Sequence, residues 1–147
     1  MRRKKGFSLI EMLIVLSVMA ALIATITPVA MNAIRKAKAI QVAYNLKVLV
    51  TGMENKILLD SAVPQDISII GRDIDTTHYG VAYTFSDGHY TIVAFTTDDV
   101  NFDMVQGTLK NATNTSSVIP TDAVFLPGGL QTASEGKVFY RVEFDIY

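Results

Sequence analysis

Residues 5–31 read KGFSLIEMLIVLSVMAALIATITPVAM, and this stretch decides the fold. Within it, residues 12–31 form a run of twenty residues without a charged side chain. A helix of about 20 residues spans a bilayer core of about 30 Å. Four basic residues and no acid precede Gly6, and Glu11 is the single acid near the start of the stretch. The pattern predicts a helix that lies in a membrane or in the apolar core of an assembly.

Three kinds of N-terminus share parts of this pattern. A secretory signal has an apolar region of about 7–15 residues, which is shorter than the run found here. A plain membrane anchor explains the length of the run and its basic flank. It does not explain Glu11, because an unpaired carboxylate costs a few kcal/mol in hydrocarbon. Arg35, Lys36 and Lys38 follow the run closely, so the positive-inside rule favours a cytoplasmic N-terminus by only a small excess of charge.

The third kind of N-terminus is indicated by the order of residues 5–16, KGFSLIEMLIVL, which resembles the prepilin motif of type IV pilins and type II secretion pseudopilins. The resemblance rests on the short basic leader, on Gly6 and Phe7, and on Glu11 four residues after Phe7. Pro28 lies where these families commonly carry a helix-bending proline. The resemblance implies that a membrane aspartyl prepilin peptidase cleaves between Gly6 and Phe7 and methylates the new Phe7 amine.

The resemblance implies roles for Glu11 and Pro28. A carboxylate in hydrocarbon needs a partner, and the new amine of Phe7 is the nearest cation. The resemblance implies that the pair forms between neighbouring copies and sets their axial register; a pair within one chain, which only lowers the cost of insertion, is the alternative. Pro28 has no N–H, so we expect the helix to kink or loosen there, with the hydroxyls of Thr25 and Thr27 near the freed backbone groups.

Composition excludes several classes of function. The chain has 147 residues, enough for one modest domain, and it has no cysteine, so it holds no disulfide and no thiolate site. Its formal net charge of −1 argues against a general nucleic-acid binder. Removing residues 1–6 lowers the number of basic residues from 13 to 9 and leaves all 14 acids. The processed chain then has a side-chain net charge of −5. We expect no enzymatic activity, because no catalytic set and no phosphate-binding loop is apparent.

The helix is predicted to continue well beyond the apolar run. An apolar stripe with spacings of three and four residues predicts one buried helix face. Pro64 disfavours helix just before it, so the helix should end near Leu59 or Asp60. The predicted organisation is a leader at 1–6, a membrane or filament-core half at 7–31, an amphipathic half at 32–60 and a globular domain at 61–147. The stripe consists of Val42, Leu46, Leu49, Met53 and Ile57.

The globular domain is predicted to be a small antiparallel sheet of three to five strands packed on the helix, so the fold class is α+β, the pilin fold by resemblance. Asp87-Gly88 is a strong two-residue turn, and a hairpin around it pairs Phe85 with Tyr90. A second alternating segment, 138–146, predicts a strand at the end of the chain. Residues 67–70 and 100–109 are further possible strands, 111–117 is a predicted loop, and 127–129 is a predicted turn.

The same hairpin register places Asp98 opposite Thr77. Asp98 and Asp99 should therefore gather near Asp73 and Asp75 at the hairpin base. Clustered carboxylates favour Ca²⁺, which takes six to eight oxygen ligands. A solvated acidic surface is the preferred interpretation and a calcium site is the alternative. No other cofactor is predicted. The two histidines, His78 and His89, lie at opposite ends of the hairpin and cannot share a metal.

Together these features predict a structural subunit of a type IV pilus-like filament, assembled through its hydrophobic helix. A type II secretion or DNA-uptake pseudopilin is the alternative in the same class, and a membrane-anchored binding domain that never polymerises is the alternative in a different class. The predicted partners are copies of the chain, prepilin peptidase, the assembly machinery of the inner membrane, and lipid before assembly. The predicted location is the inner membrane, with the N-terminus cytoplasmic, and then a surface pilus or a periplasmic pseudopilus.

Overall fold

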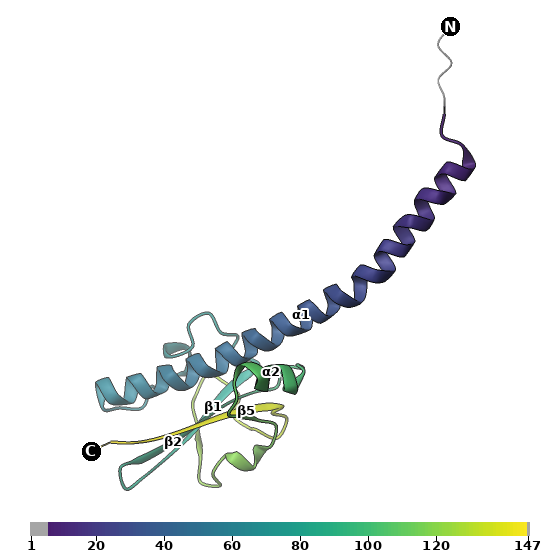
Figure 1. The fold of residues 1–147 in the computed structure, drawn as a ribbon. Coiled ribbons are helices and arrows are strands. Elements are labelled where there is room, and N and C mark those ends of the chain that lie inside the picture. Colours follow the sequence, from purple (N-terminus) through teal and green to yellow (C-terminus); the bar gives the residue numbers. More distant parts are fainter. Residues whose placement is uncertain (1–5, 147) are drawn as a thin grey trace. The chain divides into compact units, whose positions relative to one another are not determined.

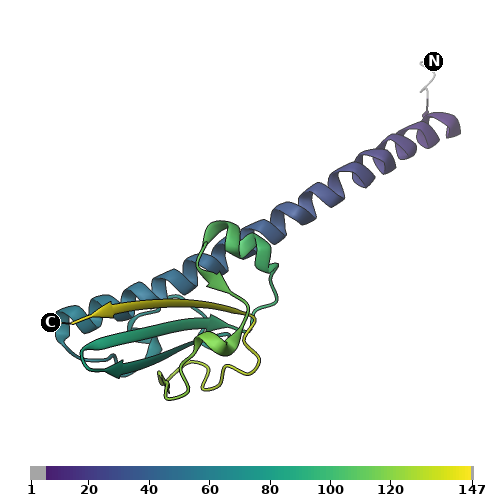
Figure 2. The same cartoon turned by 60° about the horizontal axis from the view of Figure 1, so that its bottom comes forward.

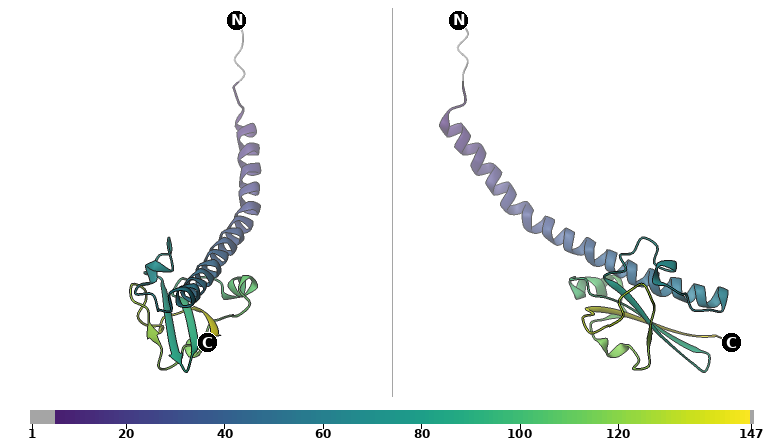
Figure 3. Two further views of the ribbon diagram at one scale, coloured as in Figure 1. Left: turned by 90° about the vertical axis from the view of Figure 1, so that its left-hand side faces the viewer. Right: turned by 180° about the vertical axis from the view of Figure 1, so that it is seen from behind.

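The computed structural model describes residues 6–146, and the chain divides into two compact units between Arg35 and Lys36. Residues 1–5, which belong to the predicted leader, lie outside the described residues. The long helix α1 spans Leu9–Asp60 and appears as one continuous ribbon (Figure 3). Its end at Asp60 agrees with the prediction from Pro64. Its start lies two residues after the predicted Phe7, because Ser8 acts as the cap of the first turn.

The part of α1 in the second unit lies along one face of a sheet (Figure 1). All five residues of the predicted stripe are buried, each with an exposed fraction of 2% or less. The sequence-based prediction of this core face is confirmed. Three further residues, Ala39, Ala43 and Val50, complete the buried face. Their small or branched side chains let the helix backbone approach the strands closely.

The sheet has five strands in the order β3-β5-β2-β1-β4, and every pairing is antiparallel. In the central hairpin, Phe85 faces Tyr90 as predicted, and the turn residues Asp87 and Gly88 have φ angles of 51° and 84°. Positive φ at both positions is what a tight hairpin turn requires. The α+β prediction is confirmed. The strands are β1 (Tyr79–Ser86), β2 (His89–Thr96), β3 (Ala112–Thr113), β4 (Val124–Phe125) and β5 (Val138–Asp145).

Three local predictions were wrong. The possible strand at 67–70 is a 3-10 helix, η1 (Ile67–Ile69), because the Asp66 side chain accepts a hydrogen bond from the Ser68 amide and caps a helical turn. The possible strand at 100–109 is the helix α2 (Phe102–Thr108), capped in the same way by Asn101. The predicted loop at 111–117 contains β3 and the start of η2 (Ser116–Val118), because β3 pairs with β5 at the sheet edge.

A second apolar cluster lies on the face of the sheet away from α1. Ala82, Val93, Phe95 and Phe139 are fully buried there, with partly buried residues between Val118 and Ala133 packed on them. Figure 2 shows this connecting segment, green to yellow, on that side of the sheet. The connection between β3 and β5 therefore covers with apolar side chains the face that the sequence alone left unassigned.

The outer edge of β5 is mostly open. β5 pairs with β2 along its whole length, whereas β3 pairs with it only at Phe139 and Tyr140. From Arg141 to Asp145 this edge has no strand partner among residues 6–146. Arg141, Glu143 and Asp145 alternate along it with the partly buried Val142 and Phe144.

We expect Leu46→Ala to destabilise the second unit by about 2–5 kcal/mol, because it opens a cavity in a fully packed site. Leu46 is 0% exposed, between α1 and the sheet. Thr51, one turn further on the opposite side, is exposed and serves as the control as Thr51→Ala. Urea unfolding of the full chain in detergent micelles measures both. Equal midpoints for the two variants would contradict the packing described.

Candidate functional site: the N-terminal segment and the hairpin base

The peptide bond between Gly6 and Phe7 lies before the first turn of α1, in non-helical chain. Both residues are exposed, and the Phe7 side chain is 78% accessible. A Cβ added to Gly6 would meet no atom within 4 Å. Packing in the described chain therefore gives no reason for glycine at position 6. A bond in exposed, non-helical chain is in the form that a protease active site accepts.

Ser8 and Glu11 form a reciprocal pair that caps α1. The Ser8 amide donates to Glu11 Oε2 at 2.8 Å, and the Glu11 amide donates to Ser8 Oγ at 3.3 Å. The first helical bond runs from the Met12 amide to the Ser8 carbonyl at 3.2 Å. This arrangement is a capping box, which satisfies two of the free N–H groups at a helix start. Glu11 also lies where the helix dipole favours a negative charge.

The capping box was missed by the sequence analysis, although the S-x-x-E spacing before an apolar run is its known signature. In the intact chain the nitrogen of Phe7 is a peptide nitrogen and carries no charge. The Glu11 carboxylate instead accepts its hydrogen bond from Ser8. The predicted pairing with a Phe7 amine belongs to the cleaved chain and stays a prediction.

The first half of α1 presents apolar side chains to its surroundings on every side. The large apolar side chains between Met12 and Met31 are 45–69% exposed, so none of them is buried within the described chain. This helix is long and apolar enough to cross a membrane. Such a surface in water is an interaction site or a membrane segment.

Pro28 lies inside this helix without ending it. The hydroxyl of Thr25 donates to the Leu22 carbonyl at 2.9 Å, and that of Thr27 donates to the Ile23 carbonyl at 2.7 Å. Neither bond reaches the carbonyl of Ala24, which Pro28 leaves without its helical donor. Thr25 and Thr27 therefore bond to backbone groups near the proline, as expected, but not to the freed one. The kink stays a prediction.

Comparison with known protein families gives a match at this N-terminal segment. The family described as the prokaryotic N-terminal methylation motif matches residues 1–27. This match supports an N-terminus of the type found in type IV pilin and pseudopilin prepilins. The motif supports a pilin-like substrate of prepilin processing. No curated protein and no solved structure matches the chain. The match covers less than a fifth of the sequence and does not include the globular domain.

The predicted acidic cluster is partly assembled at the hairpin base. Asp73, Asp75 and Asp98 line a polar hollow of about 340 Å³ together with His78 and Lys38. His78 Nδ1 lies 3.6 Å from Asp98 Oδ1. Lys38 Nζ donates to the Asp99 backbone carbonyl at 3.0 Å, which ties α1 to the end of the hairpin. The sequence pattern indicated the carboxylates, but not the lysine that faces them from the helix.

Asp99 does not join the other three acids. Its side chain is 90% exposed and pairs with Lys137 at 3.1 Å. Among residues 6–146, no three carboxylate or histidine side chains are placed to hold a metal ion. The predicted calcium site stays a prediction that this geometry does not support. His89, at the other end of the hairpin, pairs with Asp145 at 2.6 Å, so the two histidines lie at opposite ends, as expected.

Hydrogen bonds organise the rim of this hollow. Asp75 accepts from the hydroxyl and the amide of Thr77, and these bonds hold the pKa of its carboxyl below the ordinary value. Tyr79 is buried, and its hydroxyl accepts a hydrogen bond from Asn45 of α1 at 3.2 Å. Burial raises the pKa of Tyr79 to about 12. The tyrosine therefore stays neutral and joins helix to sheet.

We expect Ser8→Ala to weaken the first turn of α1 by about 1 kcal/mol, because the Glu11 amide loses its acceptor. Amide exchange of residues 9–12 in detergent micelles measures this directly. Ser8→Thr keeps the hydroxyl and should retain the protection. If the alanine variant exchanges at the rate of the parent chain, the capping box does not hold the helix start.

We expect stability to fall as pH rises from 10 to 12, because the buried Tyr79 keeps its proton when the unfolded chain has lost it. The contribution is complete below pH 10 and is lost as pH passes the folded-state pKa. A tenfold difference in proton affinity is worth about 1.4 kcal/mol, so the loss should be about 1–2 kcal/mol. Urea midpoints at pH 9 and pH 11.5 measure it. Tyr79→Phe should remove this part of the pH dependence; an unchanged slope would contradict the assignment to Tyr79.

Proposed function

We propose that this chain is a structural subunit of a type IV pilus-like filament, cleaved between Gly6 and Phe7 and methylated at the Phe7 amine. The observation that carries the proposal is the conjunction of a prepilin motif with a charge-free helix whose apolar side chains have no partner in the described chain. Apolar area of this size is stable in lipid or between copies of the helix, and a filament core supplies the second environment.

Cleavage changes the electrostatics of the helix start. It removes four basic residues and converts the uncharged Phe7 nitrogen into an ammonium one turn from Glu11. The carboxylate already accepts one bond from the Ser8 amide at 2.8 Å and has lone pairs for a second donor. A neighbouring copy's ammonium supplies that donor when copies lie side by side in the filament. The pair then neutralises both charges in an apolar core and fixes the axial offset between copies.

The membrane stage follows from the same segment. The uncharged run fits a single-pass precursor in the inner membrane. The basic residues of the leader hold the N-terminus on the cytoplasmic side until it is cut. Arg35, Lys36 and Lys38 mark the opposite boundary of the run, and the folded domain follows directly after them. Energy for moving the subunit out of the membrane comes from separate assembly machinery in this proposal.

A pseudopilin shares every one of these features, so the length of the filaments distinguishes it from a pilin. An anchored domain that never polymerises shares the helix but needs no cleavage. N-terminal sequencing of the protein from membranes tests the class: methylated Phe7 as first residue supports the prepilin class, and an intact Met1 supports the anchor. Microscopy of sheared surface material then distinguishes long pili from short pseudopili.

We expect Glu11→Ala chains to be processed normally and to form filaments with more than about a tenfold loss in yield, because an unpaired ammonium in an apolar core costs several kcal/mol. Immunoblots of the sheared and membrane fractions measure both steps. Glu11→Gln, which keeps the size of the side chain but not the charge, should show the same assembly defect. Normal yield from either variant would overturn the role of the charge pair.

We expect Gly6→Leu to block cleavage while leaving the folded domain unchanged, because the added side chain meets only the processing enzyme. Gly107, the other described glycine whose added Cβ meets no atom within 4 Å, gives the matched control Gly107→Leu. Mass spectrometry of the N-terminal peptide measures the cleaved fraction. Full processing of the Gly6→Leu chain would contradict the proposed cleavage site.

A further inference from the structure

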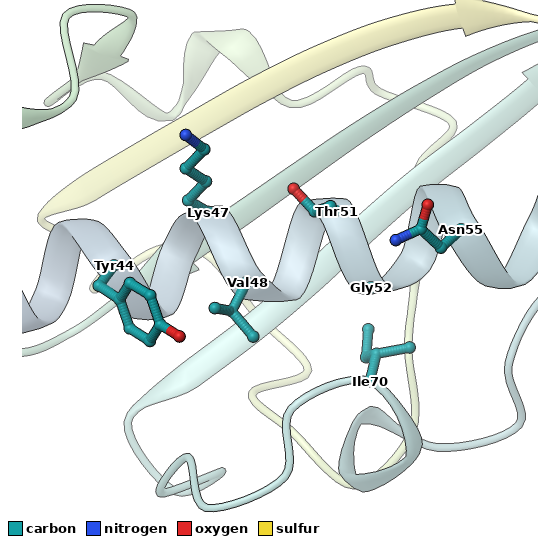
Figure 4. Close-up of a pocket in the computed structure, with 7 residues that line it drawn as sticks. All are labelled: Tyr44, Lys47, Val48, Thr51, Gly52, Asn55 and Ile70. Atoms are coloured by element: carbon teal, nitrogen blue, oxygen red, sulfur yellow. The ribbon is translucent and has the colours of Figure 1, made fainter.

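A groove of about 460 Å³ lies between α1 and the end of η1, within the second unit. Its floor is apolar, with Val48 of the helix and Ile70 of the η1 segment on the same side of α1 (Figure 4). A Cβ on Gly52 would come within 2.9 Å of the Ile70 carbonyl oxygen, so the missing side chain is what lets the η1 segment approach the helix. The groove therefore depends on the glycine at position 52.

The rim of the groove is polar. Lys47, Thr51 and Asn55 line it at spacings of four residues, so they form one polar row along the helix. All three are exposed, and Figure 4 shows Lys47 and Thr51 on the side of the helix away from Ile70. Lys47 joins none of the ion pairs formed among residues 6–146. An occupant therefore needs an apolar part for the floor and a negative, hydrogen-bonding part for the polar row.

The tip of the β1–β2 hairpin carries this combination on one short segment. The large apolar side chain of Phe85 is 57% exposed, and Ser86 and Asp87 next to it are exposed as well. Asp87 takes part in none of the ion pairs of the described chain, residues 6–146. The turn projects from the end of the sheet (Figure 1). The tip is thus a narrow projection with an aromatic ring beside a free carboxylate.

From this complementarity we propose that the groove receives the hairpin tip of a second copy of the chain. In this contact the Phe85 ring covers the apolar floor, and the Asp87 carboxylate pairs with Lys47. The Ser86 hydroxyl faces the rest of the polar row, where it can donate and accept hydrogen bonds. The proposal rests on the filament assembly proposed above and names a contact between folded domains within it.

The contact joins two different surfaces. The η1 segment lies on one side of α1 and the hairpin tip on the other, so a tip cannot enter the groove of its own chain (Figures 1 and 3). Each copy therefore offers one tip and one groove. A contact of this heterologous kind continues from copy to copy and gives an open helical assembly when its rotation does not close into a ring.

A purely apolar occupant suits this groove less well. A lipid tail or an apolar helix covers the floor but removes water from the Lys47 ammonium and the rest of the polar row without replacing its hydrogen bonds. Burying polar groups in this way costs free energy. The hairpin tip supplies a partner for the rim as well as for the floor.

Disulfide trapping tests the contact, because the chain has no cysteine of its own. Chains with Val48→Cys or Thr51→Cys are co-expressed with differently tagged chains that carry Ser86→Cys. A disulfide between the tagged chains needs Cα atoms within about 7 Å, and we expect such heterodimers in the sheared filament fraction. Thr121→Cys, at another exposed loop position, is the matched control for Ser86→Cys. Filaments in which Ser86→Cys gives no more heterodimer than Thr121→Cys would overturn the proposal.

A charge change provides a second readout that does not depend on cysteine. Lys47→Glu puts a like charge opposite Asp87 of the next copy, so filament yield should fall at least about threefold while the domain folds normally. Adding Asp87→Asn removes the repulsion and should restore part of the yield, and asparagine tolerates the φ of 51° at this position. Lys110→Glu, the same change at another exposed position, should assemble normally. If Asp87→Asn does not raise the yield of the Lys47→Glu chain, the pairing is refuted.

The contact and the proposed function fail in different ways. Filaments that form normally without the trapped heterodimer contradict only the contact between hairpin and groove. A wild-type chain that is cleaved but forms no filament contradicts the proposed function. In that case heterodimers between the groove and Ser86→Cys chains in the membrane fraction support the contact, and their absence refutes it.

Discussion

The constraint on which this structure depends is that one helix carries more apolar surface than its own chain can cover. The sheet buries one face of α1 between Ala39 and Ile57. The first half of the helix is apolar on all sides, and the opposite face of the second half exposes Ile40 and Tyr44, with Lys47 beside them. Because the domain uses only one of these surfaces, the remainder has to be satisfied by lipid or by other copies, and the fold is complete only in one of those settings.

Glu11, at the start of this helix, can be accommodated both in lipid and between copies of the chain. Before cleavage, Glu11 belongs to a local capping box with Ser8, which lowers the cost of a carboxylate near hydrocarbon without any other molecule. The same carboxylate keeps free lone pairs that a terminal ammonium can use after cleavage. Under the proposed function, Glu11 therefore has a hydrogen-bond donor both before and after cleavage, and this lowers the cost of placing a carboxylate at the start of an apolar segment.

Much of the fold could be predicted from periodicity. The buried stripe of α1, the hairpin around Asp87-Gly88 and the terminal strand depend on local spacing, which the sequence displays directly. Residues 67–70 and 100–109 were considered possible strands because they contain β-branched or mixed apolar residues, but they form the helical segments Ile67–Ile69 and Phe102–Thr108. Asp66 and Asn101 cap helical turns there, and cap geometry depends on backbone angles that composition does not reveal.

The candidate sites were predictable to different extents. Gly6, Phe7 and Glu11 were found by a contiguous motif, whereas the groove at Gly52 could not be found, since its floor is Ile70 from a separate segment. Gly52 was counted only as a weakness in the helix, although its missing side chain is what admits that segment. Surfaces made by residues distant in sequence need the tertiary structure before they can be seen.

The open edge of β5 has a consequence for crowded assemblies. An unpaired strand edge is a template on which identical domains can fuse into a continuous sheet, and a filament holds such domains at very high local density. Arg141, Glu143 and Asp145 place a charged side chain at every second position along this edge, and Arg141 pairs with Glu143 on the same strand. Pairing one such edge with another would crowd these charged side chains and remove water from them. Domains protected in this way can be tightly packed on a fibre and still separate as intact units when the fibre is taken apart.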